Sequence, residues 1–339
     1  MIVDLRSDTV TKPTPEMYEA MRNAELGDDV LGDDPTVIAL EKLAAEKMGK
    51  PSAMFVPSGT MGNQIGVKTW TQPGDAILVE QEAHILFYES GGPGAVSGVV
   101  TFTFPSKNGV PDLENIKDRV TVGSIHTPAT KLLCLENTHN RSGGAVIPID
   151  LMKKFRDFAN ENEMKIHLDG ARIFNAAHAL SVQAKDISQY ADSVMFCLSK
   201  GLSCPVGSLL VGPEDYISEA KKHRKRMGGT MRQSGILAAC GIYALSNLTE
   251  RLQEDHKRAK IFADFVNKLN GFKVDLENVQ TNIVMIDTEK PAKEISDKLY
   301  ENDVWCFAIK KNRLRCVFHR EIDDKKNQRA MDVFEKLGN

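Results

Sequence analysis

The sequence lacks the features that would assign it to a membrane or to a nucleic acid. No apolar run approaches the roughly 18 residues needed to cross a bilayer, and the first residues show no basic segment followed by an apolar one. The formal net charge is only −3 over 339 residues, which gives no reason to expect nucleic acid or an anionic membrane as a partner. We therefore expect a globular protein of the cytoplasm, without a signal peptide or a membrane span.

Cysteine spacing excludes two further classes of protein. The six cysteines form no C-x-x-C pair, and several lie inside apolar runs such as 195–198. They therefore do not indicate a disulfide framework or a zinc site. We expect buried thiols, which agrees with a reducing compartment.

Short apolar runs alternate with helical patterns through the first two thirds of the chain. The runs cover residues 53–56, 76–80, 99–104, 132–136, 165–169, 194–198 and 207–211. Such alternation predicts an α/β fold, in which a mostly parallel sheet carries helices on both faces. Ligands of these sheets bind beyond the carboxyl ends of the strands.

The two ends of the chain have a different character. Residues 1–35 show no clear period and are expected to form an extended arm, after which Asp34 and Pro35 start a helix that ends at Gly49. Past residue 245 we expect a small α+β domain. Its expected elements are a long helix over 248–269, strands near 272–276, 283–286, 304–309 and 314–318, and helices near 291–301 and 323–337. With about 150 residues per domain as a guide, the chain divides into a large domain (1–245, including the arm) and a small one (246–339).

Lys200 is the first candidate for chemistry. It follows the apolar run 194–198 and precedes Gly201. A lysine at the end of a buried strand can be desolvated, which lowers its pKa and makes its amine nucleophilic. The alternative is a lysine that extends from a strand end into solvent.

Asp169 ends the preceding strand run, so it should lie beside Lys200. Pyridoxal phosphate needs an anion against its ring nitrogen, and a carboxylate and a lysine on neighbouring strand ends meet the requirements of this cofactor. Two alternatives remain open: Asp169 could cap a helix, or it could bind a metal together with His167. Because no third metal ligand occurs at a suitable spacing, we expect no metal site.

Two other segments fit the same cofactor. Ser58, Gly59 and Thr60 follow the first strand run, and a strand, a tight glycine turn and a helix start form a cradle for phosphate. His84 follows the next run, where an imidazole can lie against an aromatic ring. An ordinary turn and a packed histidine are the simpler alternatives.

Seven motifs extend this pattern along the chain. They are Leu5-Arg6-Ser7-Asp8-Thr9, Gly27-Asp28-Asp29, Pro57-Ser58-Gly59-Thr60-Met61-Gly62-Asn63, Glu136-Asn137-Thr138-His139-Asn140, His167-Leu168-Asp169-Gly170-Ala171-Arg172, Cys197-Leu198-Ser199-Lys200-Gly201 and Gly228-Gly229-Thr230-Met231-Arg232-Gln233. As a set they resemble the threonine aldolases, both low-specificity and L-allo-threonine aldolases, over about residues 2–260. These enzymes belong to the fold-type I, or aspartate aminotransferase-like, group that uses pyridoxal 5′-phosphate.

The resemblance implies a role for each candidate residue. Lys200 would bind the cofactor covalently, Asp169 would pair with the ring nitrogen, His84 would stack on the ring and Arg172 would lie beside it. The implied phosphate ligands are Ser58, Gly59, Thr60, Lys225 and Arg232. The last two would act from a neighbouring subunit of a homodimer or homotetramer with shared active sites.

The resemblance also implies the substrate and the reaction. Ser7 and Arg315 would bind the carboxylate of an amino acid, with Arg172 as a third ligand, and His126 would lie near its side chain. The reaction is retro-aldol cleavage of L-threonine, L-allo-threonine and related β-hydroxy-α-amino acids to glycine and an aldehyde. His84, His126 and a bound water are all candidates for the base. The alternatives are a β-eliminating lyase of the same superfamily and a cofactor-binding protein without activity.

Overall fold

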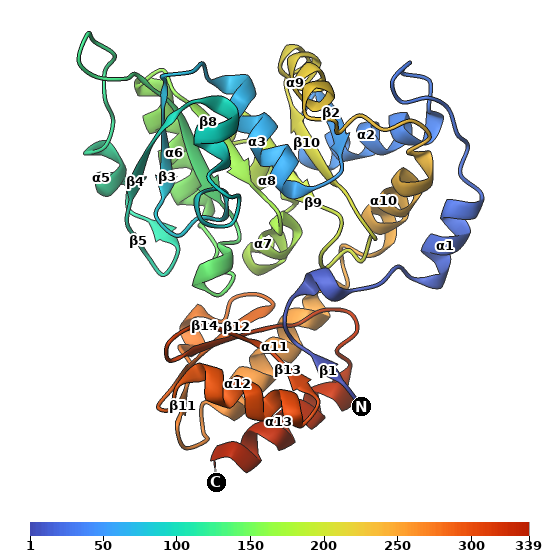
Figure 1. The fold of residues 1–339 in the computed structure, drawn as a ribbon, viewed down its shortest axis with the longest axis vertical. Coiled ribbons are helices and arrows are strands. Elements are labelled where there is room, and N and C mark those ends of the chain that lie inside the picture. The colour runs from blue at the N-terminus through green and yellow to red at the C-terminus, as the bar shows by residue number, and fades with distance from the viewer. Residues whose placement is uncertain (339) are drawn as a thin grey trace.

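A seven-stranded sheet forms the centre of the computed structural model, which describes residues 1–338 (Figure 1). In spatial order the strands are β2 (Ser52–Val56), β10 (Ser208–Gly212), β9 (Ser193–Cys197), β8 (Lys165–Asp169), β7 (Thr130–Glu136), β3 (Ala76–Glu80) and β4 (Val100–Phe104). Only β10 runs antiparallel to its neighbours. The predicted α/β class with a mostly parallel sheet is confirmed, and each of the seven apolar runs forms a strand.

Helices cover both faces of this sheet. Alternate residues of a strand point to opposite faces, so Phe55 and Met54 of β2 belong to different hydrophobic clusters. The helices on the face of Phe55 are α2 (Pro35–Met48), α6 (Ile149–Glu161), α7 (Ile173–Leu180), α8 (Ala184–Ser188) and α10 (Gly235–Asn247). On the face of Met54 lie α3 (Gly59–Trp70) and α9 (Glu214–Arg226). Burial on both faces explains why the strands appear as continuous apolar runs.

The N-terminal arm is more ordered than we expected. Residues Val3–Asp4 form strand β1, and Pro15–Arg22 form helix α1, whose first turn is capped by the Thr14 hydroxyl. The Thr-Pro pair at 14 and 15 is a helix start signal of the same kind as Asp34-Pro35. The expectation of an extended arm was therefore wrong for α1.

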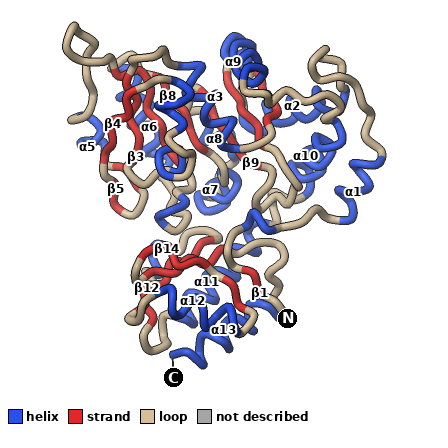
Figure 2. The backbone as a smooth tube through the Cα atoms, in the orientation of Figure 1, coloured by secondary structure: helices blue, strands red, loops and turns tan. Residues whose placement is uncertain are grey.

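A second, four-stranded antiparallel sheet lies below the first (Figures 1 and 2). Its spatial order is β11 (Phe272–Lys273), β12 (Ile283–Thr288), β15 (Arg313–Val317) and β14 (Phe307–Lys310). The helices of this part are α11 (Leu252–Val266), α12 (Ala292–Glu301) and α13 (Asp324–Gly338). Shorter elements occupy the connections elsewhere: α4 (His84–Phe87), β5 (Ser106–Lys107), β6 (Val110–Pro111) and α5 (Leu113–Lys117). None of the helices in the described residues has the length and apolar character of a membrane span.

Two elements of this part differ from the expected ones in their bounds. The chain over 304–309 forms two strands, because β13 (Val304–Trp305) leaves the four-stranded sheet and pairs in parallel with β1. The helix expected from 248 begins only at Leu252, where the chain has turned after α10. Val3 and Leu5 join the hydrophobic cluster of the smaller part, so the start of the chain packs beside its C-terminal third. A domain boundary near 245 remains a prediction.

Asp34 connects two helices of the larger part. Its Oδ1 accepts the backbone N–H groups of Thr36 and Val37 at the start of α2, and its Oδ2 accepts that of Gly235 at the start of α10. We predict that Asp34→Ala lowers the free energy of unfolding by about 2 kcal/mol, because a helix cap and a buried acceptor are both lost. Denaturant unfolding measures the difference. Asp34→Asn, which keeps one cap oxygen, should lose less, and an alanine variant as stable as the wild type would contradict the prediction.

Candidate active site

A cavity of about 500 Å³ opens where the carboxyl ends of the large sheet face the smaller part. His84 follows β3, Arg172 follows β8 and Lys200 follows β9, while Phe307 and Arg315 come from β14 and β15. The complete lining is Ser7, Thr9, His84, Tyr88, Asn140, Arg172, Lys200, Phe307, Ala308, Ile309 and Arg315. Candidate residues from five distant segments of the chain therefore meet in one cavity.

Hydrogen bonds hold the backbone of Lys200 in place, whereas its side-chain amine has no partner among the described residues. Its carbonyl oxygen accepts hydrogen bonds from the Thr11 hydroxyl, at 2.9 Å, and from the backbone N–H of Ser203. Among residues 1–338, no hydrogen bond or ion pair engages the half-buried ammonium. The lysine is thus placed in the cavity with its nitrogen unoccupied.

Asp169 ends β8, which pairs in parallel with the strand that leads to Lys200. Its carboxylate is almost completely buried, and Oδ2 accepts a 2.8 Å bond from the side chain of Asn63. Oδ1 accepts the backbone N–H of Ala171, but helix α7 begins later, with Arg172 at its N-cap position. The alternative of a helix cap does not describe this aspartate.

The start of α3 contains the residues for which we expect a phosphate cradle, and that role remains a prediction. The Ser58 hydroxyl caps the helix by accepting the backbone N–H of Met61. A side chain at position 59 would bring its Cβ within 2.8 Å of the Cys197 sulfur, so Gly59 lets this helix end lie against the end of β9. Free N–H groups at a helix start favour an anion, which suits the phosphate of the cofactor.

His84 lies among buried carboxylates that the sequence did not reveal. Its Nδ1 is 2.9 Å from Oε1 of Glu89, and its backbone N–H donates to Glu136. Burial lowers the pKa of His84, but the bond to Glu89 and the charge of Asp169 raise it by more, so the pKa lies above its usual value. Glu89 therefore holds one ring nitrogen and increases the basicity of the other.

The three groups His84, Glu89 and Asp169 have ligand atoms within 4.8 Å of one another, a spacing that could suit a cation. However, the side-chain amide of Asn63 donates to both carboxylates, at 2.8 Å each. Gln64 donates to the second oxygen of Glu89. Both carboxylates of this cluster therefore already have hydrogen-bond donors from the protein.

Two arginines line the cavity: the charge of Arg172 is paired with a carboxylate, and the charge of Arg315 is not. Arg172 makes a two-point ion pair with buried Asp8, with both N–O distances at 2.7 Å, and its charge holds the pKa of Asp8 down at about 2 even though burial alone would raise it. Arg315 donates only to the neutral oxygens of Asn140 and Arg6, and its buried Nε has no partner among the described residues. Burial, followed by the charge of Arg172, lowers the pKa of Arg315. The free charge of Arg315 and its unpaired donor fit an incoming carboxylate.

Comparison with known proteins gives the family of the chain. The model of the β-eliminating lyase family matches residues 4–289. A probable low-specificity L-threonine aldolase of Arabidopsis thaliana is 43% identical over 99% of this chain and 97% of its own. The low specificity L-threonine aldolase of Escherichia coli K12 is 46% identical over 84% of each chain.

The chain belongs to the threonine aldolases of the β-eliminating lyase family.

Solved structures agree with the expected fold of this family member. A threonine aldolase of Leishmania major has a TM-score of 0.85 at 20% identity. The match covers 99% of this chain and 100% of the Leishmania chain. An aspartate aminotransferase variant of Thermus thermophilus has a TM-score of 0.75 at 16% identity and covers 99% of this chain and 91% of its own. The predicted aspartate aminotransferase-like fold is confirmed.

Seven candidates do not line this cavity. Four of them, Ser58, Gly59, Thr60 and Asp169, lie at the helix and strand ends described above, and the other three are His126, Lys225 and Arg232. His126 is exposed on the loop before β7, and Lys225 is exposed near the end of α9. Arg232 is bound to Asp28 at 2.8 Å, with 61% of its side chain exposed. None of these three residues lines the cavity of the single chain, and their roles remain predictions.

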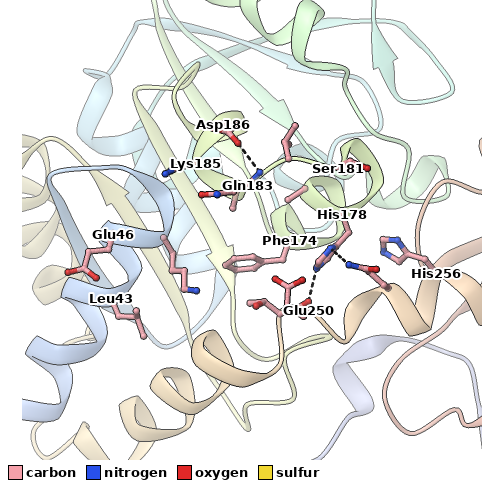
Figure 3. Close-up of a pocket in the computed structure, with 16 residues that line it drawn as sticks. Leu43, Glu46, Phe174, His178, Ser181, Gln183, Lys185, Asp186, Glu250 and His256 are labelled. Carbon is pink, nitrogen blue, oxygen red and sulfur yellow. Dashed lines mark hydrogen bonds between the residues drawn. The ribbon is translucent and has the colours of Figure 1, made fainter.

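A larger cavity, of about 1000 Å³, lies elsewhere in the protein, between α2, α7, α8 and the start of α11 (Figure 3). Figure 3 shows His178, Glu250 and His256 at one side and Glu46 at the other. His178 bonds to the Thr249 carbonyl and to Gln253, so its ring is already engaged. Because Lys200 and Arg315 line the smaller cavity and not this one, the smaller cavity is the candidate active site.

We predict that Glu89→Gln moves the pKa of His84 from above its usual value of about 6.5 to below it. The variant removes the carboxylate that favours the cationic ring, whereas the burial that opposes the cation remains. Titration of the labelled imidazole by NMR measures the change. Glu82→Gln is the matched control, since Glu82 pairs with Lys310 and Arg141 and has no bond to His84. A His84 pKa that stays above about 6.5 would refute the assignment.

Proposed function

We propose that this protein uses pyridoxal 5′-phosphate to cleave L-threonine, L-allo-threonine and related β-hydroxy-α-amino acids to glycine and an aldehyde. The observation that carries the proposal is one cavity containing an unoccupied lysine, Lys200, and an arginine with an unpaired buried donor, Arg315. The relatives of Arabidopsis thaliana and Escherichia coli are named for this activity.

The residues present fit this cofactor. Lys200 provides the amine for covalent attachment, and Asp169 provides a buried anion on the next strand. Ser58, Gly59 and Thr60 provide the helix start for the phosphate, where a side chain at 59 would obstruct Cys197. When bound, the ring system supplies an acceptor for the electron pair of a broken bond at the substrate Cα.

The arginines orient the substrate. Arg315 has free charge to bind the substrate carboxylate, with the Ser7 hydroxyl beside it, and fixing the carboxylate fixes the direction of the Cα–Cβ bond. Arg172 is already paired with Asp8, so its main contribution is to hold Asn140 and the wall of the cavity. Tyr88, Phe307 and Ile309 form an apolar side that suits the carbon chain beyond Cβ.

His84 is the strongest candidate for the base within one chain. Because Nδ1 donates to the Glu89 carboxylate, the neutral ring has Nε2 free to accept the proton of the β-hydroxyl. His126 and a water remain alternatives. A base of this kind typically contributes about 10²–10⁴-fold to the rate.

A product assay tests the proposal directly. The four stereoisomers of threonine are supplied separately with pyridoxal 5′-phosphate, and acetaldehyde, glycine, 2-oxobutanoate and ammonia are measured. Acetaldehyde and glycine in equal amounts from the L-isomers are expected. A 2-oxo acid with ammonia would instead show the β-eliminating lyase, and no turnover despite bound cofactor would show a protein without activity.

Lys200→Ala should lose the visible absorbance of covalently bound cofactor and nearly all turnover, because no other lysine lines the cavity. The visible absorbance is read directly. Covalent attachment is then measured as the cofactor that remains on each protein after borohydride has reduced the imine and free cofactor has been dialysed away. Lys50→Ala is a suitable control, since the amine of Lys50 is bound to the Ala191 carbonyl away from the cavity. An unchanged spectrum in the Lys200 variant would place the attachment on another lysine.

We also propose that the protein is a homodimer or a homotetramer in which subunits share active sites. Lys225 lines a surface hollow together with Leu31 and Ile38. These two apolar side chains are 74% and 51% exposed, which is typical of a surface that contacts another protein. A second subunit on this surface could bring Lys225 and Arg232 to a phosphate, and His126 to a substrate.

Mixing two inactive variants tests the shared site. When Lys200→Ala and Arg232→Ala subunits exchange, one site in each mixed dimer regains both groups, so activity should return to about a quarter of the wild-type value if pairing is random. Exchange is monitored with differently tagged chains. If exchange is complete and both variants remain inactive, Arg232 acts within its own chain.

A further inference from the structure

A continuous chain of hydrogen bonds extends from Asp169 through buried residues that do not line the cavity. Asn63 donates to Asp169 Oδ2 at 2.8 Å, and its Oδ1 is 3.1 Å from Nε2 of His167. His167 Nδ1 is 2.9 Å from the Ser193 hydroxyl, which also accepts the indole N–H of Trp70 at 2.8 Å. Asn63, His167 and Ser193 are each 0% exposed, so this chain is isolated from solvent.

The donors and acceptors give the chain one direction. Asn63 uses both amide hydrogens on the carboxylates of Glu89 and Asp169, so only its oxygen can face His167. His167 must then carry its hydrogen on Nε2, and its bare Nδ1 accepts the hydroxyl hydrogen of Ser193. Every hydrogen from Trp70 onward therefore points toward Asp169.

His167 remains neutral in this chain. Complete burial lowers the pKa of His167 to about 4, although the charge of Asp169 opposes the shift. A neutral ring polarises Asn63 without forming an ion pair with the carboxylate. Asp8 differs in this respect, because its charge is fully paired with Arg172.

Helix α3 contains a space that this ring requires. A Cβ at position 66 would lie only 2.3 Å from Cε1 of His167, so only glycine lets the helix pass over the imidazole. Glycine inside a helix costs about 1 kcal/mol relative to alanine. Gly66 therefore makes the helix less stable, but it leaves room for the ring of His167.

We propose that His167, acting through Asn63 and backed by Ser193, is a positioning residue that holds Asp169 as an oriented anion for the cofactor's ring nitrogen. Dipoles aligned in a buried chain reinforce one another, and together they stabilise the carboxylate without neutralising it. This inference rests on the proposed use of pyridoxal 5′-phosphate. The simpler alternative is a histidine whose bonds serve packing alone.

The test compares three variants in protein reconstituted with cofactor labelled with ¹⁵N in the ring. His167→Phe keeps a flat ring but has no donor, whereas His167→Gln has an amide that can donate to Asn63 and accept from Ser193. Ser188→Ala is the control, because Ser188 is equally buried and its hydroxyl has no partner among the described residues. The readouts are the ¹⁵N shift of the ring nitrogen, the dissociation constant of the cofactor and the melting temperature.

In the His167→Phe variant, the ¹⁵N shift of the ring nitrogen should move toward its unprotonated value. Cofactor binding should weaken about fivefold, the factor expected for the loss of one neutral hydrogen bond. His167→Gln should recover most of both, and Ser188→Ala should change neither. A folded His167→Phe protein with the wild-type ring-nitrogen shift and the wild-type affinity for the cofactor would overturn the proposed role of His167. A wild-type protein that binds no cofactor would instead refute the proposed function.

The wild-type apoprotein provides a second measurement if His167→Phe does not fold. With ¹⁵N-labelled histidine, the His167 signal should be that of a neutral ring with hydrogen on Nε2 at every pH down to about 5, as its pKa of about 4 requires. A cationic ring at neutral pH, or hydrogen on Nδ1, would overturn the proposed direction. Ser193→Ala should weaken cofactor binding by a smaller factor than His167→Phe.

Discussion

The parallel pairing of β8 with β9 is the constraint on which the site depends. Parallel strands end at the same edge of a sheet, so Asp169 and Lys200 emerge side by side although 30 residues separate them in the chain. The connection over the sheet also places Arg172 at the start of α7. A slip of β8 by one residue would turn Asp169 to the opposite face, where a hydrophobic cluster packs.

The charges around the cavity are arranged by pairing some groups and leaving others unpaired. Arg172 and Asp8 neutralise each other in a buried pair, which stabilises the wall but leaves no net charge to bind a ligand. Arg315 and Lys200 have no carboxylate partner among the described residues. A carboxylate that enters this space would therefore meet the unpaired charge of Arg315.

The sequence predicted the parts of this design that depend on local pattern. Seven apolar runs predicted the large sheet, and strand ends predicted Lys200 and Asp169. Glu89 and Asn63 were not identified, because their partners come from helix and strand segments whose proximity exists only in the folded chain. The division of 304–309 was missed for a similar reason: apolar residues mark a strand but not its neighbour, and β13 changes sheets to pair with β1.

That pairing also affects the order in which the protein can form. The first strand of the chain pairs with residues 301 positions further on, since Val3 lies opposite Val304. Ser7 and Asp8 follow it directly, so the cavity wall that they provide cannot be completed until nearly the whole chain has left the ribosome. Contacts of such long sequence separation form slowly, because a large loop must close first. Synthesis therefore yields a large sheet first and a binding-competent site last, and a truncated chain would lack the site even where most of its core had formed.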